Sequence, residues 1–372
     1  MFHETSISLA NVVPVEFQTT EKDVPGNDHL ARGTMWKACV SLAVLPALCH
    51  GFAAPNPLQE FLSKIARIEG APSAAAATAE VVAVDPLKRY NLTSSTKPKP
   101  FFARPEQYID LLRASMPLIF RFTSGLFANG YSIGLIDKND KIYSVAIIGS
   151  KQISETNTIP PKTQPSKPLV LYEFETCPFC RKVREAVSML SLEVEFRPTP
   201  KNGRLWRQEI KQKYGTKTTF PFLLDPNTGA EMFESDKIIQ YLFTTYGNGV
   251  VPWTLSSNIW VPLTAGLGLV WRGGGEAKLS NPPSQPVTYW SYEGSPFCKI
   301  PQETLCELEI PYIQISCPRG SVNRQRMFDE TTRFQAPYLQ DPNTGVSLWE
   351  SEAIVEYLRK EYGVDKSPVK YL

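Results

Sequence analysis

The sequence predicts an α/β protein that contains two tandem copies of one compact unit. The main evidence is an internal repeat: DPNTGAEMFESDKIIQYLFTTYG at 225–247 matches DPNTGVSLWESEAIVEYLRKEYG at 341–363, and 12 of the 23 aligned residues are identical. Upstream, ETCPFCRK at 175–182 aligns with EGSPFCKI at 293–300. Solenoid repeats are usually roughly 20 to 50 residues long, and these copies lie much further apart, so we expect two domains of about 80 residues joined by a connector.

Each copy is expected to run strand, helix, strand, helix, hairpin, helix. In the first copy, Val183, Ala186, Val187 and Leu190 recur at helical spacing, which indicates a helix with one buried face. The stretch 225–229 has the residues of a tight turn between two short apolar runs. The other expected elements of this copy are strands at 169–174, 194–196 and 222–224, a basic helix at 205–214, and a last helix carrying Ile238, Ile239 and Leu242.

The composition excludes several classes of function. The 39 basic and 37 acidic residues leave a net charge of +2, so no overall basic field marks a nucleic-acid-binding protein. All three histidines, His3, His29 and His50, lie in the first 50 residues. If that region is removed or flexible, the folded body has no imidazole for Ser-His-Asp or Cys-His catalysis or for a His-ligated zinc site. The 7 cysteines are too few for a disulfide scaffold in a chain of 372 residues.

Residues 1–100 are expected to be a presequence and a linker. From Met35, a basic flank, an apolar run to Cys49 and then small residues form the three parts of a secretory signal at 35–54. The Ala-rich, acid-poor stretch 55–100 is typical of a transit peptide. Together they resemble the bipartite signal of proteins sent to complex algal plastids, with Met35 as the start of translation. The alternative is an N-terminal extension with no targeting role.

Residues 101–150 are expected to form a helix and a β-hairpin. The helix has apolar residues at helical spacing, and Pro117 should bend or end it. Strand-like runs at 131–136 and 142–148 are joined by Asp-Lys-Asn-Asp, which favours a turn. A Pro-rich linker is expected at 151–167. The unit is too small to bury much surface by itself, so we expect it to pack on a neighbour or a partner.

The two copies, at 168–248 and 286–372, resemble the thioredoxin fold. Each has a βαβ unit followed by a ββα unit, and in the first copy a Cys-x-x-Cys motif follows the first strand. The motif Cys177-Pro-Phe-Cys180 is similar to that of dithiol glutaredoxins and of the glutaredoxin-like N-terminal domain of glutathione transferases, including the membrane-associated prostaglandin E synthase type. The resemblance implies a cis-proline at Pro221 beside the active cysteine, and glutathione as ligand.

The position of Cys177 favours thiol chemistry. A thiol attacks as the thiolate, and free cysteine with a pKa of about 8.5 is mostly protonated at neutral pH. At the first turn of a helix, backbone N–H groups and the helix dipole favour the anion, and Arg181, Lys182 and Arg184 add positive charge nearby. Cys180 follows one turn later on the same side, where it can displace a mixed disulfide. We therefore assign Cys177 as nucleophile and Cys180 as resolving thiol.

Three alternatives remain for this cysteine pair. The first is that the two thiols are a buried structural pair. The second is that they form half of a zinc site, although no second Cys-x-x-Cys motif supplies the remaining zinc ligands. The third alternative is an iron–sulfur cluster bridged between two chains through Cys177 and glutathione, as known among glutaredoxins. We expect no metal ligands of the protein's own beyond these.

Five residues of the first copy are candidates for binding glutathione. A cis-proline leaves the preceding backbone free to pair with a bound peptide. The start of the last helix can receive the γ-glutamyl carboxylate while Asp236 meets its ammonium group. The candidates are Phe220, Pro221, Glu234, Ser235 and Asp236, of which Glu234-Ser235 matches the acid-serine motif of the resembled family. Seven basic residues either hold the glycyl carboxylate or an acidic partner, or form a solvated face: Arg197, Lys201, Arg204, Arg207, Lys211, Lys213 and Lys217.

The second copy departs from the first at the decisive position. Ser295 replaces the nucleophile, and a hydroxyl with no histidine to activate it is a poor one. Pro301 falls inside the expected helix, where it should kink it. We expect a degenerate domain that binds a thiol compound or packs against the first copy. Cys298, Cys306 and Cys317 are expected to be core thiols, with a Cys298–Cys317 bridge left open. The binding residues that still match are Pro337, Glu350, Ser351 and Glu352.

A hydrophobic connector is expected at 249–285. Residues 250–271 are uncharged and reach the length of a membrane span, but two prolines and several polar residues weaken that interpretation. The preferred interpretation is a hydrophobic helix that packs on the domains, or that associates with a membrane surface or a membrane complex through 249–272.

The leading hypothesis is a plastid thiol–disulfide oxidoreductase that uses Cys177 and Cys180, with glutathione or a protein thiol as partner. The first alternative is a non-catalytic thioredoxin-fold subunit for binding or assembly in a plastid membrane complex. The second is a glutathione transferase or isomerase, which is weakened because no all-helical domain follows the first copy. No nucleic-acid partner is expected.

Overall fold

The computed structural model describes residues 86–92, 98–99, 107–121, 123–256, 263–264, 266 and 273–364. All of them belong to one compact unit, Ala83–Leu372. The expected signal at 35–54 and most of the transit-like stretch at 55–100 lie outside the described residues.

An eight-stranded sheet forms the centre of this unit, in the order β11-β10-β8-β9-β5-β4-β6-β7. Within each copy the first two strands are parallel and the last two are antiparallel neighbours. The thioredoxin-like fold of both copies is therefore confirmed. The first copy contributes β4 (Leu169–Glu173), β5 (Glu193–Pro198), β6 (Phe222–Asp225) and β7 (Ala230–Phe233), and the second contributes β8 (Val287–Ser291), β9 (Tyr312–Ser316), β10 (Tyr338–Asp341) and β11 (Val346–Trp349).

The two copies share this sheet through their second strands. β5 pairs with β9 in antiparallel register, from Glu193 opposite Ile315 to Phe196 opposite Tyr312. The rings of Phe196 and Tyr312 stack with their centroids 5.0 Å apart and their planes at 5°. An exposed strand edge presents unpaired N–H and C=O groups, and each copy satisfies the edge of the other. The copies thus form one continuous sheet, so the second copy packs against the first, which was one of the two expectations for it.

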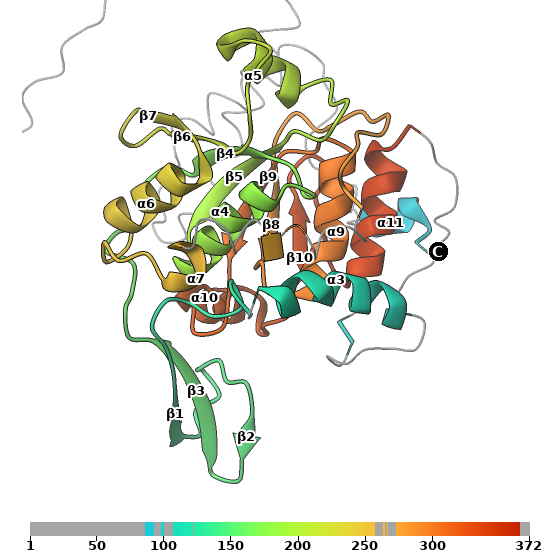
Figure 1. Cartoon of the computed structure of the whole chain (residues 1–372). Helices are drawn as coiled ribbons and strands as arrows, with labels where there is room; N and C mark the ends of the chain where they lie inside the picture. Colours follow the sequence, from blue (N-terminus) through green and yellow to red (C-terminus); the bar gives the residue numbers. More distant parts are fainter. Residues whose placement is uncertain are drawn as a thin grey trace, which may run out of the picture. The chain divides into compact units, whose positions relative to one another are not determined.

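Helices of both copies cover the two faces of the sheet (Figure 1). On the first face a single apolar core runs through both copies. Leu169 and Leu171 of β4 point into this core, whereas Val170 and Tyr172 point to the opposite face. Because both faces are buried, the strand is apolar up to Tyr172, and its last residue, Glu173, is a buried carboxylate paired with Arg184. The first face carries α4 (Pro178–Met189), α6 (Ser235–Thr245), α9 (Pro296–Glu307) and α11 (Ser351–Tyr362), and the second carries α5 (Trp206–Tyr214) and α10 (Val322–Thr331).

The strongest part of the repeat has a structural cause. The Asp225 carboxylate accepts hydrogen bonds from the hydroxyls of Tyr241 at 2.6 Å and Tyr246 at 2.5 Å, so it ties the β6–β7 turn to α6. Its other oxygen accepts from the backbone N–H of Asn227 at 2.8 Å. The second copy repeats the arrangement at the same distances with Asp341, Tyr357, Tyr362 and Asn343.

The middle unit differs from the expectation in its strands. Helix α3 (Tyr108–Phe120) runs past Pro117 without ending there. Strand β1 (Tyr131–Asp137) pairs with β3 (Lys151–Asn157), and β2 is only Ile147–Ile148. The expected strand at 142–148 is therefore mostly loop, and the first seven residues of the expected linker at 151–167 are a strand.

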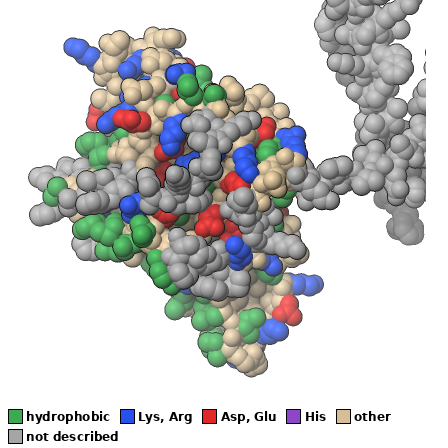
Figure 2. Space-filling model, turned by 90° about the vertical axis from the view of Figure 1, so that its right-hand side faces the viewer, with side chains coloured by type: hydrophobic (Ala, Val, Ile, Leu, Met, Phe, Trp, Pro, Cys, Tyr) green, Lys and Arg blue, Asp and Glu red, His purple; other side chains and the backbone are tan. Residues whose placement is uncertain are grey.

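The polar composition of β3 explains the misassigned linker. Its sequence KQISETN resembles a linker, yet Gln152 is buried and its side chain accepts a hydrogen bond from the backbone N–H of Asn139. Glu155 ties the strand to the second copy through Arg319 at 2.5 Å and Arg324 at 3.2 Å. Hydrophobic side chains gather over this small sheet, at the lower end of the molecule in Figure 2.

Two short elements flank these parts. A 3-10 helix, η3 (Pro86–Tyr90), precedes the middle unit, and α7 (Trp253–Ser256) follows the first copy. Most of the expected hydrophobic helix at 250–271 lies outside the described residues. Within the part of the chain that the structure describes, no helix has the length and apolar character needed to cross a membrane.

Candidate active site

Cys177 lies at the N-terminus of α4, directly after β4. It is the N-cap residue, and its Sγ accepts a hydrogen bond from the backbone N–H of Cys180 at 3.2 Å. Pro178 occupies the first helical turn, where a backbone N–H has no partner within the helix. The local sequence therefore places a sulfur atom where the unsatisfied N–H groups of the helix point.

Hydrogen bonding shifts the pKa values of the two thiols of the motif in opposite directions. Burial alone would raise the pKa of Cys177, but hydrogen bonds from the Cys180 thiol and backbone N–H to its sulfur hold that pKa below its ordinary value. Burial raises the pKa of Cys180 well above its ordinary value, and its hydrogen bond to Cys177 adds to that rise. The geometry thus favours the thiolate on Cys177 and the proton on Cys180.

A cavity of about 480 Å³ lies beside Cys177. The peptide bond between Phe220 and Pro221 is cis, and the carbonyl oxygen of Phe220 lies 3.8 Å from the Cys177 Sγ. Four of the five glutathione candidates line the cavity: Phe220, Pro221, Glu234 and Ser235. Its other lining residues are Phe174, Pro178, Phe179, Arg207, Thr218 and Thr219. Pro178 and Phe179 belong to the Cys-Pro-Phe-Cys motif, Thr219 precedes Phe220-Pro221 in the cis-proline motif, and Arg207 is one of the seven basic residues, whereas Phe174 and Thr218 were not candidates.

Asp236, the fifth glutathione candidate, pairs with Lys182 and does not line the cavity. Its Oδ1 lies 2.5 Å from the Nζ of Lys182, whose side chain is fully buried. Lys182 comes from α4, which packs beside α6, so the contact follows from helix packing that the sequence does not display. We expected Asp236 to meet the ammonium group of glutathione; in the structure it is outside the cavity lining and neutralises Lys182.

Arg207 is the one member of the basic cluster that lines the cavity, all seven being among the described residues. Its guanidinium lies over the rings of Phe220 at 4.8 Å and Phe174 at 5.2 Å. Its Nε donates to the carbonyl oxygens of Thr199 at 3.0 Å and Pro200 at 2.6 Å. These contacts fix a positive charge at the cavity wall, where it can meet a carboxylate.

The second copy reproduces the backbone of this site with a serine in place of Cys177. Ser295 caps α9, and its Oγ accepts from the backbone N–H of Cys298 at 3.3 Å. The peptide bond between Ala336 and Pro337 is cis. Pro301 lies inside helix α9, as expected, and the helix continues past it to Glu307.

The cysteines of the second copy are free and buried. Cys298 and Cys317 lie in one apolar cluster but form no disulfide, and Cys306 is buried as well. Burial raises the pKa of Cys298 to about 11, so this thiol stays protonated at neutral pH. Within the described residues, no cluster of His, Cys, Asp and Glu could hold a metal ion.

A buried cluster of charges lies between α4 and α9, at the junction of the two copies. Arg184 pairs with Glu173, with Glu175 at 3.3 Å and with Glu293 of the second copy at 3.0 Å. Lys299 of the second copy lies 2.6 Å from Glu175, at ion-pair distance but without hydrogen-bond geometry, and 2.8 Å from Glu293. The remaining members are Arg121, Arg181 and Glu185.

This cluster acts on the charge of Cys177. Glu173 acts to raise the pKa of Cys177 and Arg184 acts to lower it. Four carboxylates face four cationic groups, so the positive charge that the sequence places beside Cys177 is balanced by glutamates from both copies. The sequence showed the basic residues Arg181, Lys182 and Arg184 as a local motif, but it did not show their pairing with Glu293, which lies more than one hundred residues away in the second copy.

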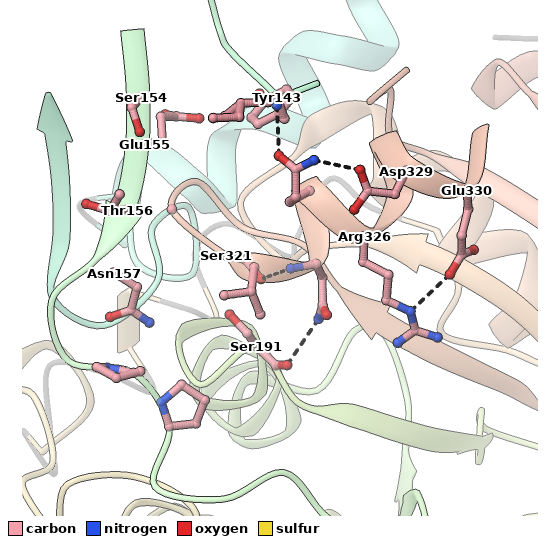
Figure 3. Close-up of a pocket in the computed structure, with 17 residues that line it drawn as sticks. Tyr143, Ser154, Glu155, Thr156, Asn157, Ser191, Ser321, Arg326, Asp329 and Glu330 are labelled. Carbon is pink, nitrogen blue, oxygen red and sulfur yellow. Dashed lines mark hydrogen bonds and ion pairs between the residues drawn. The ribbon is translucent and has the colours of Figure 1, made fainter. Parts of the chain in front are cut away.

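A second cavity, of about 720 Å³, lies between β3 and α10 (Figure 3). Tyr143 and Gln325 both line this cavity, and the backbone N–H of Tyr143 donates a hydrogen bond to the side chain of Gln325. Arg326 lies on its α10 wall, paired with Glu330 at 3.1 Å. None of the candidate residues from the sequence lies in this cavity.

Comparisons with known proteins agree with the fold. Residues 171–249 and 290–367 each match the family model described as "Glutathione S-transferase, N-terminal domain". The chain is 36% identical over 84 residues to "Glutathione S-transferase-like protein tpcF" of Aspergillus fumigatus, covering 23% of this chain and 37% of that protein. It is 38% identical over 79 residues to "Glutathione S-transferase GstB" of Escherichia coli K12, covering 21% of this chain and 38% of that protein. No solved structure matches the chain.

The chain therefore carries a glutathione S-transferase N-terminal domain of the thioredoxin fold at two places. The match spans less than two fifths of each of these curated relatives.

Proposed function

We propose that this protein is a glutathione-linked thiol–disulfide oxidoreductase with one active site, at Cys177. The observation that carries the proposal is the division between the two thiols: Cys177 is favoured as thiolate and Cys180 as thiol, beside a cavity that adjoins a cis-proline. A low-pKa thiolate next to a protonated thiol is the arrangement that disulfide exchange uses.

The reaction would begin with attack by the Cys177 thiolate on the glutathionyl sulfur of a mixed disulfide. A bond forms between Cys177 and that sulfur, the original S–S bond breaks, and the substrate sulfur leaves as a thiolate that takes a proton from water. A glutathione thiolate then attacks the glutathionyl sulfur on Cys177, releasing oxidised glutathione and restoring the Cys177 thiolate. In sum, a mixed disulfide and one glutathione yield a thiol and oxidised glutathione.

Cys180 offers the second route of resolution. Its thiolate would attack the Cys177 sulfur, forming the Cys177–Cys180 disulfide and releasing glutathione, and two further glutathione molecules would reduce that disulfide. Burial opposes ionisation of Cys180, which slows this route. Cys180 ionises more easily once Cys177 is in a disulfide, because the Cys180 thiol then no longer donates a hydrogen bond to the Cys177 thiolate.

Glutathione would lie in the cavity beside Cys177. Glu234 and Ser235, at the start of α6, would receive its γ-glutamyl end near the backbone N–H groups of the helix. The backbone of Phe220 is outside the β6 ladder and adjoins the sulfur, so it can pair with the cysteinyl part of the ligand. Arg207 would meet the glycyl carboxylate.

The test is glutathione-dependent reduction of a mixed disulfide by the full chain. Cys177→Ser should lower the rate at least roughly 100-fold, because a serine hydroxyl is not ionised at neutral pH. Cys180→Ser should retain most of the rate, because glutathione itself can resolve the mixed disulfide. Equal rates for the unaltered chain and Cys177→Ser would overturn the proposal.

A second candidate, glutathione conjugation, is favoured by the names of the relatives. It requires the thiolate of bound glutathione rather than of Cys177. The transferase would be favoured by two results together: conjugation of 1-chloro-2,4-dinitrobenzene persists in Cys177→Ser, and the rate of disulfide reduction is the same in Cys177→Ser as in the unaltered chain.

We further propose that the protein acts in a plastid, on the basis of the signal-like stretch 35–54 and the transit-like stretch 55–100. N-terminal sequencing of the mature protein should find a start beyond residue 54. An intact Met1 on the mature protein would exclude this location.

A further inference from the structure

The two copies differ in what their binding motifs contact. In the first copy, the motif residues Thr219, Glu234 and Ser235 line an open cavity. The residues at the same positions of the second copy are Gln335, Glu350 and Ser351. Two of these, Gln335 and Glu350, bind the main chain of Lys99, which precedes them by more than two hundred residues.

Both main-chain polar groups of Lys99 are bound. Its N–H donates to the Oε1 of Glu350 at 2.9 Å, and its carbonyl oxygen accepts from the Nε2 of Gln335 at 3.2 Å. The same amide nitrogen of Gln335 lies 2.8 Å from the Oε1 of Glu350, so the two side chains hold one another in place. Paired donor and acceptor groups of this kind recognise an extended peptide by its main chain.

The sequence of the bound segment suits this mode of recognition. Lys99 lies between Pro98 and Pro100. A residue that precedes proline is restricted to extended conformations, and proline itself fixes φ. The segment therefore loses little conformational freedom on binding. Lys99 also carries the one backbone N–H of this Pro-Lys-Pro tripeptide, and that group is the donor to Glu350.

The chain on both sides of Lys99 is attached to helix α11. Near its C-terminal end, the Nζ of Lys360 donates to the carbonyl oxygens of Tyr90 at 3.1 Å and Asn91 at 2.9 Å. At its N-terminal end, Glu352 accepts from the Nε2 of Gln107 at 2.7 Å. These attachments hold Lys99 near its site at a high effective concentration.

Glu352 also departs from its counterpart. In the first copy Asp236 pairs with Lys182 of α4, but the residue aligned with Lys182 is Ile300. The second copy thus has no internal cation at that place, and the amide of Gln107 meets Glu352 instead.

We propose that the second copy is a peptide-binding site occupied in cis by Pro98–Lys99, with Gln335 and Glu350 as the residues that hold it. The main chain of Lys99 takes the groups that would otherwise receive a free peptide such as glutathione. The second copy then serves to dock the N-terminal segment, and of the two motif sites in the described residues the one in the first copy stays open. The proposal makes no use of the reaction at Cys177, so it stands or falls separately from the proposed function.

Hydrogen exchange of the full chain tests the proposal, because the peptide from 98 to 100 contains a single amide. In the unaltered chain that amide should exchange at least roughly tenfold more slowly than in an unstructured peptide. Glu350→Ala and Gln335→Met should each remove most of this protection. The matched changes in the first copy, Glu234→Ala and Thr219→Met, should leave it unchanged.

Protection of the amides of β8 and β10 in the same experiment reports whether the second copy is folded. Gln335 is half-buried and outside the strands, so its variant keeps the test valid if Glu350→Ala does not fold. An unprotected Lys99 amide in the unaltered chain, or full protection in a folded Gln335→Met chain, would overturn the proposal.

Discussion

Cys177 and Ser295 show how much of the site is decided by single atoms. Their backbones are nearly superposable, with φ and ψ of −91° and 118° for Cys177 and −105° and 115° for Ser295. Each accepts a hydrogen bond from the backbone N–H three residues later. The same geometry stabilises a thiolate on sulfur but cannot ionise a hydroxyl at neutral pH, so the proposed nucleophile has no equivalent at this position of the second copy.

The ionisation of Cys177 can be measured by its rate of alkylation with iodoacetamide. The rate should rise with pH through a midpoint below the ordinary thiol value of about 8.5, because only the thiolate reacts and its pKa is lowered. Cys180→Ala should move the midpoint upward, since the hydrogen bond from the Cys180 thiol is lost. A midpoint that is unchanged in Cys180→Ala would contradict this origin of the shift, and Cys177→Ser supplies the background rate.

Arg207 is expected to contribute to glutathione binding. Arg207→Gln should raise the KM for glutathione roughly 10- to 150-fold, because a hydrogen bond to a charged group contributes about 1.5–3 kcal/mol. Arg204→Gln makes the same charge change at an exposed position outside the cavity and should leave KM within about twofold. Thermal unfolding of both variants separates a binding effect from loss of the contacts with Thr199 and Pro200. Equal KM values in the two variants would remove Arg207 from the site.

At the scale of elements, helices α4 and α9 carry buried charges that are neutralised by the other copy. Each brings charged side chains into a region without solvent, and each relies on a glutamate of the other copy for neutralisation: Arg184 on Glu293, and Lys299 on Glu175. Removing one partner leaves a buried charge uncompensated, which costs more than the pair contributes.

Lys299→Met should therefore lower the free energy of unfolding by about 3–5 kcal/mol. Lys278→Met provides the control, because Lys278 is largely exposed and its pair with Glu307 should contribute less than about 1 kcal/mol. Urea unfolding followed by tryptophan fluorescence measures both. Similar losses in the two variants would mean that the cluster does not depend on Lys299.

At the scale of the whole molecule, the two copies behave as one folding unit. They share a sheet through β5 and β9, a continuous apolar core and the buried charge cluster. We expect one cooperative unfolding transition for residues 107–364, because separating the copies would expose a strand edge, apolar side chains and charges at once.

Phe196→Ala tests this cooperativity. Phe196 is fully buried and stacks on Tyr312, so the substitution should cost about 3–5 kcal/mol. Hydrogen exchange should show the loss in both copies, at β4 and β8 alike. Destabilisation confined to the first copy, or two separate transitions in the unaltered chain, would show that the copies unfold independently.

The sequence was most informative where structure depends on local order. The repeated turn, the helix that follows Cys177 and the cis-proline at Pro221 could be anticipated, because each depends on neighbouring residues or on a motif. Four of the five glutathione candidates do line one cavity. The strand β3 could not be anticipated, because its polar sequence is stabilised by its partner β1 and by burial of Gln152.

By itself, the sequence determined the α/β class, the duplication and the one cysteine with the setting of a nucleophile. Only the tertiary structure decided which distant groups meet: that β5 and β9 join the copies, that Lys182 takes Asp236, and that Glu350 holds Lys99. The physical reason is that helix spacing and turn chemistry act over a few residues, whereas strand edges and buried charges are satisfied by whatever partner the fold brings near.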